Sequence, residues 1–401
     1  MTEPGPWRVV IAPDKFKGSL TAPEVAMYLA RGLTAAVPGL LTDEVPVADG
    51  GDGTVDAAVA AGYRRAEITV HGPAGDPAAA AFALSGETAV IESAQACGLS
   101  RLPGGRRIPL TATSEGVGEL IAAAADLGAR RIVLGLGGVA TTDGGAGLVH
   151  ALGGRLLDGD GREIAGGGAA LADLRTLDLT GLRDLSDIEF LLASDVDNPL
   201  LGPEGAAVIY GPQKGAAAAD VPVLDAALTR WADVAEDALA AVRPPDLGWP
   251  EERLRFRDRP GAGAAGGLGF AALAFLNARM RPGIEEMLEL VGFGSRVAGA
   301  SLVITGEGSL DEQTLRGKAP AGVARATVAV APATPVVAVA GVCALEPAAL
   351  SRAGIAGAYA LSDIEPDVES CMANAGPLLE KLASQVAADW LSPPAPAQLN
   401  G

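Results

Sequence analysis

The chain has 401 residues and a formal net charge of -19, with 49% hydrophobic and 20% charged residues. Because this length exceeds one ordinary hydrophobic core, two domains of roughly 150 to 200 residues are expected. The acidity argues against a nucleic-acid or anionic-membrane partner, since either would require a basic surface.

Three cysteines, Cys97, Cys343 and Cys371, lie far apart and form no CxxC pair. This pattern indicates reduced thiols, and the segment MTEPGPWR lacks the basic and apolar regions of a signal peptide, so we expect a cytoplasmic protein. The uncharged segment 326–345 is interrupted by two prolines. It is therefore expected to contain a helix end, a turn and a buried strand rather than a membrane span.

The first predicted element is a buried strand at 8–12, where β-branched residues dominate. A helix follows, because Thr21, Pro23 and Glu24 fit a capping box with a proline in the first turn, and Gly32 is expected to end this helix. The loop between the two elements would lie at a strand end and at a helix N-terminus. Free N–H groups favour anions at such a place, so the loop is a candidate site for a phosphate or a carboxylate.

Further strands and helices alternate along the chain, which is the order of an α/β fold. Strands are expected at 45–48, 66–70, 82–94, 131–136, 188–193, 301–305, 336–340 and 359–361, and helices at 54–61, 114–127 and 220–242. Ser114 is expected to cap the second of these helices. The segment 243–260, rich in proline and charge, is the best linker candidate, and residues 391–401 are expected to form a disordered tail.

Six polar, glycine-rich stretches follow or interrupt these elements: APDKFKGS, ADGGDGT, GLGGVATTDGGAG, SDVDNPLLGPEG, GPQKG and ITGEGSLDEQT. Together they supply backbone N–H groups, carboxylates and lysines, which are the parts that phosphoryl transfer requires. No GxxxxGK(S/T) motif occurs, so a P-loop is excluded as the nucleotide grip. The two histidines, His71 and His150, occur in no triad-like context, and we interpret each as structural.

Dinucleotide binding is an alternative interpretation of one glycine loop. Residues 135–140 satisfy GxGxxA after a predicted strand, and Asp158 follows at the distance of a ribose-binding acid. However, the sequence TTDGG at 141–145 interrupts the helix that this fingerprint requires. Two alternative functions stay open. One is an NAD(P)-dependent oxidoreductase of a small hydroxy acid, and the other is a non-catalytic sugar-acid binding protein.

The long motifs APDKFKGSLTAPEVA, VADGGDGT, GLGGVATTDGGAG, ASDVDNPLLGPEGAA with GPQKG, AGAAGGLG and VITGEGSLDEQT, in this order, resemble the bacterial glycerate kinase family. This family is unrelated to P-loop kinases, and the resemblance covers roughly residues 7–385. It implies a Rossmann-like α/β domain formed by residues 1–75 and 290–390, with a second α/β domain inserted at 76–289. It also implies transfer of the γ-phosphoryl group of MgATP to a hydroxyl of D-glycerate, giving 2-phosphoglycerate in preference to 3-phosphoglycerate.

Within this resemblance, Asp195 is the first choice for the carboxylate that orients or deprotonates the substrate hydroxyl, and Asp49 is the second. Lys15 and Lys17 are expected to neutralise the glycerate carboxylate or the moving phosphoryl group. Because many relatives carry serine at the position of Lys15, the catalytic role is assigned to Lys17.

The remaining predicted contacts fall into three groups. Substrate binding is assigned to Asp14, Lys15, Ser19 and Asp52, nucleotide binding to Gly135, Gly137, Gly138, Asp143, Gly144, Gly306, Gly308 and Lys318, and magnesium binding to Glu307 and Asp311. ATP and Mg²⁺ are the expected cofactors, and the small molecule glycerate is the expected partner. The oligomeric state stays open, with a homodimer as the candidate assembly.

Overall fold

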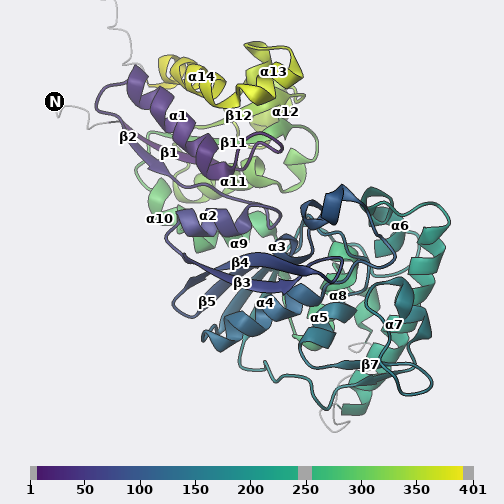
Figure 1. Ribbon diagram of the computed structural model, residues 1–401. Coiled ribbons are helices and arrows are strands. Elements are labelled where there is room, and N and C mark those ends of the chain that lie inside the picture. The colour runs from purple at the N-terminus through teal and green to yellow at the C-terminus, as the bar shows by residue number, and fades with distance from the viewer. Residues whose placement is uncertain (1–6, 243–254, 392–401) are drawn as a thin grey trace, which may run out of the picture. The chain divides into compact units, whose positions relative to one another are not determined.

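The computed structural model describes residues 7–242 and 255–391. Contacts between residues divide the chain into two compact units. Unit 1 comprises Met1–Asp49, Asp56–Ala61 and Ile284–Gly401, and unit 2 comprises Gly50–Val55 and Gly62–Gly283. Each unit holds a β-sheet covered by helices, which confirms the predicted α/β class (Figure 1).

Unit 1 is built on a five-stranded sheet in the order β13-β12-β11-β1-β2, in which all neighbouring strands are parallel. Its strands are β1 (Arg8–Pro13), β2 (Leu41–Glu44), β11 (Leu302–Leu310), β12 (Val336–Cys343) and β13 (Gly357–Ala360). Its helices are α1 (Ala22–Ala36), α10 (Phe293–Val297), α11 (Ala319–Val330), α12 (Pro347–Arg352), α13 (Val368–Ala373) and α14 (Ala375–Trp390), with most of α2 (Thr54–Ala60) and α9 (Gly283–Leu290).

Successive residues of each central strand in unit 1 face opposite sides of the sheet. On β1, Val9 and Ile11 pack with α1 and α14, whereas Val10 and Ala12 pack in a separate cluster with α9, α10 and α11. The sheet is therefore covered on both faces, as parallel sheets require. The chain leaves β1 towards β2 on one side and leaves β11 towards β12 on the other, so the topological switch point lies between β1 and β11.

Unit 2 is built on a six-stranded mixed sheet in the order β10-β9-β6-β5-β4-β3. Its strands are β3 (Arg64–His71), β4 (Pro77–Ser85), β5 (Thr88–Glu92), β6 (Arg131–Gly135), β9 (Glu189–Ala193) and β10 (Arg279–Arg281), and a separate hairpin pairs β7 (Arg155–Leu157) with β8 (Thr176–Asp178). Its helices are α3 (Ser93–Cys97), α4 (Glu115–Asp126), α5 (Ala146–Ala151), α6 (Ala206–Tyr210), α7 (Asp220–Val242) and α8 (Leu268–Phe275). The neighbouring strands β5, β6, β9 and β10 are parallel to one another, so their carboxyl ends share one edge of the sheet.

The capping box predicted at the start of α1 is present, because Thr21 accepts a hydrogen bond from the Glu24 amide and Glu24 accepts one from the Thr21 amide. The predicted end at Gly32 is wrong, since α1 continues to Ala36. Gly32 instead faces α14, where a Cβ atom would clash with the backbone of Glu380. This glycine therefore serves close helix packing rather than helix termination.

Several other boundaries differ from the sequence predictions. The strand expected at 45–48 lies at Leu41–Glu44, although the amides of Val45 and Val47 continue the pairing along β1. The stretch 82–94 contains the end of β4, the whole of β5, which is antiparallel to β4, and the start of α3. Ser114 precedes α4 without a side-chain capping bond to it. The short strands β7, β8 and β10 were not predicted.

Residues 243–254 of the linker candidate and residues 392–401 of the tail lie outside the described residues. Segment 326–345 contains the end of α11, a turn and the whole of β12, as predicted. Within residues 7–242 and 255–391, we find no helix with the length and hydropathy needed to span a membrane.

Candidate active site

In unit 1, Asp14 lies at the topological switch point, directly after β1. Its amide donates a hydrogen bond of 2.8 Å to the Gly306 carbonyl of β11, and its side chain is buried. The Lys15 amide donates to Asp14 Oδ1 at 2.6 Å, and Lys15 Nζ lies 3.7 Å from the same oxygen. The predicted substrate residues Asp14 and Lys15 therefore form one ion pair at the edge where open α/β sheets bind ligands.

The rest of the loop is a tight turn held by the buried ring of Phe16. The Ser19 amide and hydroxyl both donate to the Phe16 carbonyl, at 2.9 and 3.1 Å. Gly18 has a φ of 83°, a conformation that glycine adopts without strain. The Ser19 hydroxyl thus serves its own turn, whereas Lys17 is exposed.

The charges of two carboxylates, Asp49 and Glu307, act on Asp14 at this end of unit 1. The pKa of Asp14 is raised to about 7: burial is the largest cause, Lys15 opposes the rise, and the charges of Asp49 and Glu307 add to it. Buried like charges of this kind are stabilised by a cation placed among them. The local field at Asp14 therefore favours a proton or a metal ion.

Glu307 is a buried residue of β11, which extends to Leu310, beyond the strand expected at 301–305. Its carboxylate accepts hydrogen bonds from the Thr314 hydroxyl and, at 3.4 Å, from Lys318 Nζ. Burial raises the pKa of Glu307, and both of these donors oppose the rise. Thr314 was not singled out in the sequence, because a lone threonine in a polar stretch carries no signal.

The other residues predicted in ITGEGSLDEQT have local roles in the structure. Asp311 Oδ1 accepts hydrogen bonds from the amides of Gln313 at 2.8 Å and Thr314 at 3.4 Å, so this carboxylate closes its own turn. Gly306 pairs with Val339 of β12, and a Cβ atom on Gly306 would clash with Val339. Gly308 lies next to the Lys17 amide, which a Cβ atom would approach to 3.3 Å.

In unit 2, the loop ADGGDGT packs against the glycine loop after β6. A Cβ atom on Gly135 or Gly137 would clash with the backbone of residues 50–51, and one on Gly138 would clash with the Asp52 carboxylate. The predicted nucleotide glycines and the predicted substrate residue Asp52 are thus neighbours. Close approach of two loops is one reason for glycine at these positions.

Glu92, the last residue of β5, holds this loop and was missed by the sequence reasoning. Its buried carboxylate accepts hydrogen bonds from the amides of Gly53 at 3.0 Å and Val55 at 3.3 Å. An acidic residue that directly follows the apolar run AVI was the available signal. Glu92 acts on the loop rather than on a ligand in this geometry.

Asp195 follows β9 at the same edge of the unit 2 sheet. Its side chain is exposed, and its Oδ1 accepts a hydrogen bond from the Gly283 amide at 3.3 Å. Gly50 lies against the Ala193 carbonyl at the end of β9, where no Cβ atom would fit. The structure thus brings Asp195 and the loop at residues 50–53 to neighbouring places in unit 2.

Asp143 and Gly144, both predicted to contact the nucleotide, are buried in unit 2. Asp143 accepts hydrogen bonds from the Ser114 amide and hydroxyl, both at 2.8 Å, and from the amides of Gly145 and Gly147. Burial raises the pKa of Asp143, and these donors oppose the rise. Gly144 packs against Trp231, whose Nε1 donates to its carbonyl at 2.9 Å. These contacts favour structural roles for Asp143 and Gly144 rather than contact with the nucleotide.

Lys214 of the GPQKG motif is also buried in unit 2. Its Nζ donates to the Thr141 carbonyl at 2.5 Å. Burial lowers the pKa of Lys214 to about 8, although the neighbouring Cys97 and Asp143 raise it. This lysine therefore supports the loop after β6 from inside the core.

The geometry does not support the dinucleotide alternative. Residues 136–145 form no helix after β6, and α5 begins only at Ala146. The Asp158 carboxylate accepts hydrogen bonds from the amides of Asp160 and Arg162, at 2.8 and 2.9 Å, within its own turn. A ribose-binding acid at a helix N-terminus is therefore not formed.

Comparisons with known proteins converge on one family. Residues 9–391 match the model described as the glycerate kinase family. The chain is 45% identical over 385 residues to a glycerate kinase of Bacillus subtilis (strain 168), covering 95% of this chain and 97% of that protein. It is 45% identical over 323 residues to a glycerate 2-kinase of Escherichia coli (strain K12), covering 79% of this chain and 81% of that protein.

A solved structure shows the same similarity. The crystal structure described as a glycerate kinase 2 from Salmonella typhimurium LT2 matches with a TM-score of 0.77 and 39% sequence identity. The match covers 96% of this chain and 100% of that chain.

Proposed function

Because the chain belongs to the glycerate kinase family, we propose that it transfers the γ-phosphoryl group of MgATP to the 2-hydroxyl of D-glycerate. The family match over residues 9–391 carries this proposal. In the reaction the glycerate oxygen bonds to the γ-phosphorus, the bond to the bridging oxygen of ADP breaks, and the hydroxyl proton is released. The name of the Escherichia coli relative, glycerate 2-kinase, supports 2-phosphoglycerate over 3-phosphoglycerate.

Asp195 is the proposed carboxylate that orients or deprotonates the hydroxyl. The exposed position of Asp195 at the end of β9 supports this role, and the Gly283 amide fixes one carboxylate oxygen. A general base needs such a fixed geometry within hydrogen-bond reach of its proton. Asp49 is the second choice for the same role.

Lys17 is the proposed cation for the transferring phosphoryl group. Its exposure at the tip of the loop after β1 supports this assignment. Lys15 forms an ion pair with the buried Asp14, so its charge is partly neutralised by that carboxylate. Lys15 therefore suits a role in holding the glycerate carboxylate or in placing Asp14.

The carboxylates of unit 1 have the right chemistry for Mg²⁺, which prefers oxygen ligands. Burial raises the pKa of Asp14 at the switch point, and the charges of Asp49 and Glu307 add to the rise. Among the two acids predicted for the metal, Glu307 suits the role better than Asp311, because the charge of Glu307 acts on Asp14, whereas the Asp311 carboxylate closes its own turn. When bound, Mg²⁺ would neutralise phosphate charge during transfer.

The two units are the proposed domains, with the N- and C-terminal segments forming the Rossmann-like one. The parallel sheet of unit 1, with a switch point between β1 and β11, supports this assignment. The sequence-based boundaries at residues 75, 76, 289 and 290 stay predictions.

The test is a reaction of the full chain with ATP, Mg²⁺ and D-glycerate, followed by ³¹P NMR. We expect ADP and 2-phosphoglycerate to form together, with L-glycerate as the control acceptor. Formation of 3-phosphoglycerate would overturn the choice of hydroxyl. Absence of ATP turnover with glycerate would overturn the kinase proposal.

A further inference from the structure

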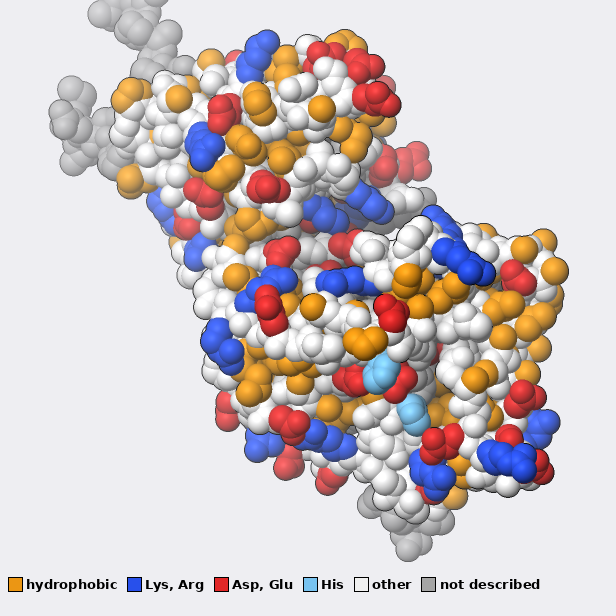
Figure 2. Space-filling view, in the orientation of Figure 1, with side chains coloured by type: hydrophobic (Ala, Val, Ile, Leu, Met, Phe, Trp, Pro, Cys, Tyr) orange, Lys and Arg blue, Asp and Glu red, His pale blue; other side chains and the backbone are white. Residues whose placement is uncertain are grey.

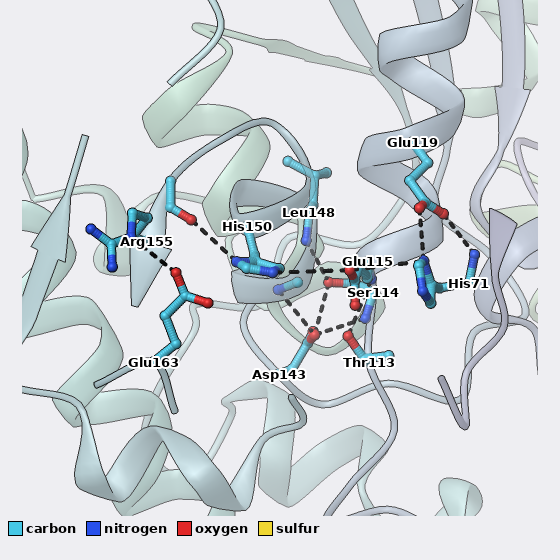
Figure 3. Close-up of polar contacts among 12 residues, drawn as sticks. His71, Thr113, Ser114, Glu115, Glu119, Asp143, Leu148, His150, Arg155 and Glu163 are labelled. Carbon is cyan, nitrogen blue, oxygen red and sulfur yellow. Dashed lines mark hydrogen bonds and ion pairs between the residues drawn. The ribbon is translucent and has the colours of Figure 1, made fainter. Parts of the chain in front are cut away.

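Both histidines of the chain lie in one cluster of unit 2. His71 ends β3, Glu115 and Glu119 lie on α4, and His150 lies on α5 (Figure 3). His71 Nδ1 lies 2.7 Å from Glu119 Oε1 and 3.8 Å from Glu115 Oε1. His150 Nε2 lies 4.0 Å from the same Glu115 oxygen. The sequence interpretation of two separate structural histidines did not anticipate this cluster.

The backbone is built to bring these side chains together. Glu115 and Glu119 are four residues apart on α4, which places both carboxylates on one face of the helix. A Cβ atom on Gly116 would clash with the His71 carbonyl, and one on Gly118 would clash with the α5 backbone at Leu148. Glycine at these two positions therefore lets α4 touch both of the elements that carry a histidine.

Hydrogen bonds then fix the orientation of the two carboxylates. The His71 amide donates to Glu119 Oε2 at 2.6 Å, which turns Oε1 towards the imidazole. The first turn of α4 is anchored by the buried Asp143 through Ser114, and the Glu115 amide donates to the Thr113 hydroxyl at 3.2 Å (Figure 3). A site held in this way needs little reorganisation to bind a ligand.

The cluster has an excess of negative charge, because two carboxylates face one imidazole. Two carboxylates face one imidazole nitrogen, although its single N–H can serve only Glu119 well. Like charges four residues apart also disfavour a helix by a few tenths of a kcal/mol, roughly. Figure 2 shows histidine side chains at the surface beside acidic ones.

We propose that His71, Glu115 and Glu119 bind a divalent transition-metal cation of the Zn²⁺ class. Their ligand atoms already lie within 4.8 Å of one another. With metal–ligand distances of about 2.0–2.2 Å, tetrahedral ligand atoms stand about 3.4 Å apart. The observed separations of 2.7 and 3.8 Å bracket that value, so small side-chain rotations complete the site.

The surroundings suit a three-ligand site with an open position. Of the three proposed ligands, Glu115 lines a hollow of about 110 Å³, which has room for water on that side of the site. His150 Nε2 lies 4.0 Å from Glu115 Oε1, which is ion-pair range but too long for a hydrogen bond, so we do not count it as a ligand. An imidazole among carboxylates favours Zn²⁺-like ions over Mg²⁺. This site is therefore distinct from the proposed Mg²⁺ site in unit 1.

The experiment is a titration of the full, metal-free chain with Zn²⁺ followed by isothermal calorimetry, without ATP or Mg²⁺. We expect saturable binding of one ion and a rise in the melting temperature that a chelator reverses. His71→Ala and Glu119→Gln should each weaken Zn²⁺ binding by roughly 10-fold or more. Co²⁺ bound in place of Zn²⁺ should give a visible absorption band that both variants lose.

The matched control is Glu67→Gln, an exposed glutamate on the same strand as His71. This variant should bind Zn²⁺ as the wild type does. Circular dichroism of each variant verifies that the fold is kept. Absence of saturable binding to the wild type, or wild-type affinity in well-folded His71→Ala and Glu119→Gln variants, would overturn the proposal.

Discussion

Asp14 is the residue at which burial and charge most clearly oppose each other. Its side chain is buried, and its pKa is raised from 3.8 to about 7 by burial first and by two acidic neighbours besides. A raised carboxyl pKa means that the folded protein binds this proton more tightly than the unfolded chain does. The stability linked to Asp14 is therefore full below pH 4 and is lost as the pH rises through about 7.

Asp14→Asn should remove this pH dependence, because asparagine stays neutral and can still accept the Lys15 amide hydrogen bond. In the metal-free protein, the free energy of unfolding should match the wild type near pH 4 and exceed it above pH 7. The shift in pKa from 3.8 to about 7 corresponds to roughly 4 kcal/mol at full ionisation. Urea unfolding across this pH range measures the difference. Asp237→Asn, an exposed change on α7, is the control, and an equal pH profile for the two variants would contradict the argument.

Asp195 is the residue on which the proposed chemistry most depends. Asp195→Asn keeps the size of the side chain and an oxygen for the Gly283 amide but removes the charge. If the carboxylate acts on the substrate hydroxyl, kcat should fall by roughly 10²-fold or more while the melting temperature stays near the wild-type value. Asp197→Asn, an exposed change two residues away, is the control. A near wild-type kcat in Asp195→Asn would move the role to Asp49.

At the scale of elements, features that depend on neighbouring residues could be predicted from the sequence, whereas features that depend on tertiary contacts could not. The box at Thr21 and Glu24 involves residues three positions apart, so the start of α1 was predicted correctly. Glycine is typical of helix ends, but Gly32 is needed because the backbone of α14 at Glu380 packs against it. Glu380 comes near Gly32 only through the fold. A local pattern cannot distinguish a glycine that ends a helix from one that lets two helices touch.

The same limit explains the misread strand and the missed site residues. The stretch after Thr305 has the glycines and charges of a loop, yet β11 continues through it, paired with β1 up to Gly306 and with β12 beyond. Glu92 depends on a loop forty residues earlier in the chain. His71 and His150, 79 positions apart, come together at Glu115 of α4. The α/β class and the polar strand ends were predictable, because periodicity and turn composition encode them locally.

Gly32→Ala tests the packing of α1 against α14. The added methyl group would meet the backbone of Glu380, which cannot move without displacing α14, so we expect a loss of about 1–3 kcal/mol in stability. The matched control is Gly294→Ala on α10, where the new Cβ atom would have its nearest neighbour at 3.8 Å. That change should be neutral or stabilising by up to about 1 kcal/mol. Equal urea midpoints for the two variants would show that α1 and α14 are not tightly packed at Gly32.

At the scale of the whole molecule, the chain places its two proposed cation sites in different units. Unit 1 holds the carboxylates around Asp14, and unit 2 holds the cluster around His71. Unit 2 has its own sheet and its own hydrophobic core, which are the requirements for folding alone. Its short segment Gly50–Val55 comes from before β3 and belongs to it through the hydrogen bonds of Glu92.

A fragment of residues 50–283 should therefore fold, bind Zn²⁺ and fail to phosphorylate glycerate, since Asp14 and Lys17 are absent from it. A fragment of residues 62–283 should be less stable, because the buried Glu92 carboxylate then loses the amides of Gly53 and Val55. Each lost partner of a buried charged group costs about 1–3 kcal/mol, which for a fragment of this size lowers the melting temperature by several degrees, roughly. Thermal melts followed by circular dichroism compare the two fragments, and Zn²⁺ titration verifies the metal cluster in each. Equal melting temperatures would contradict the role assigned to Glu92, and kinase activity in the 50–283 fragment would contradict the roles assigned to Asp14 and Lys17.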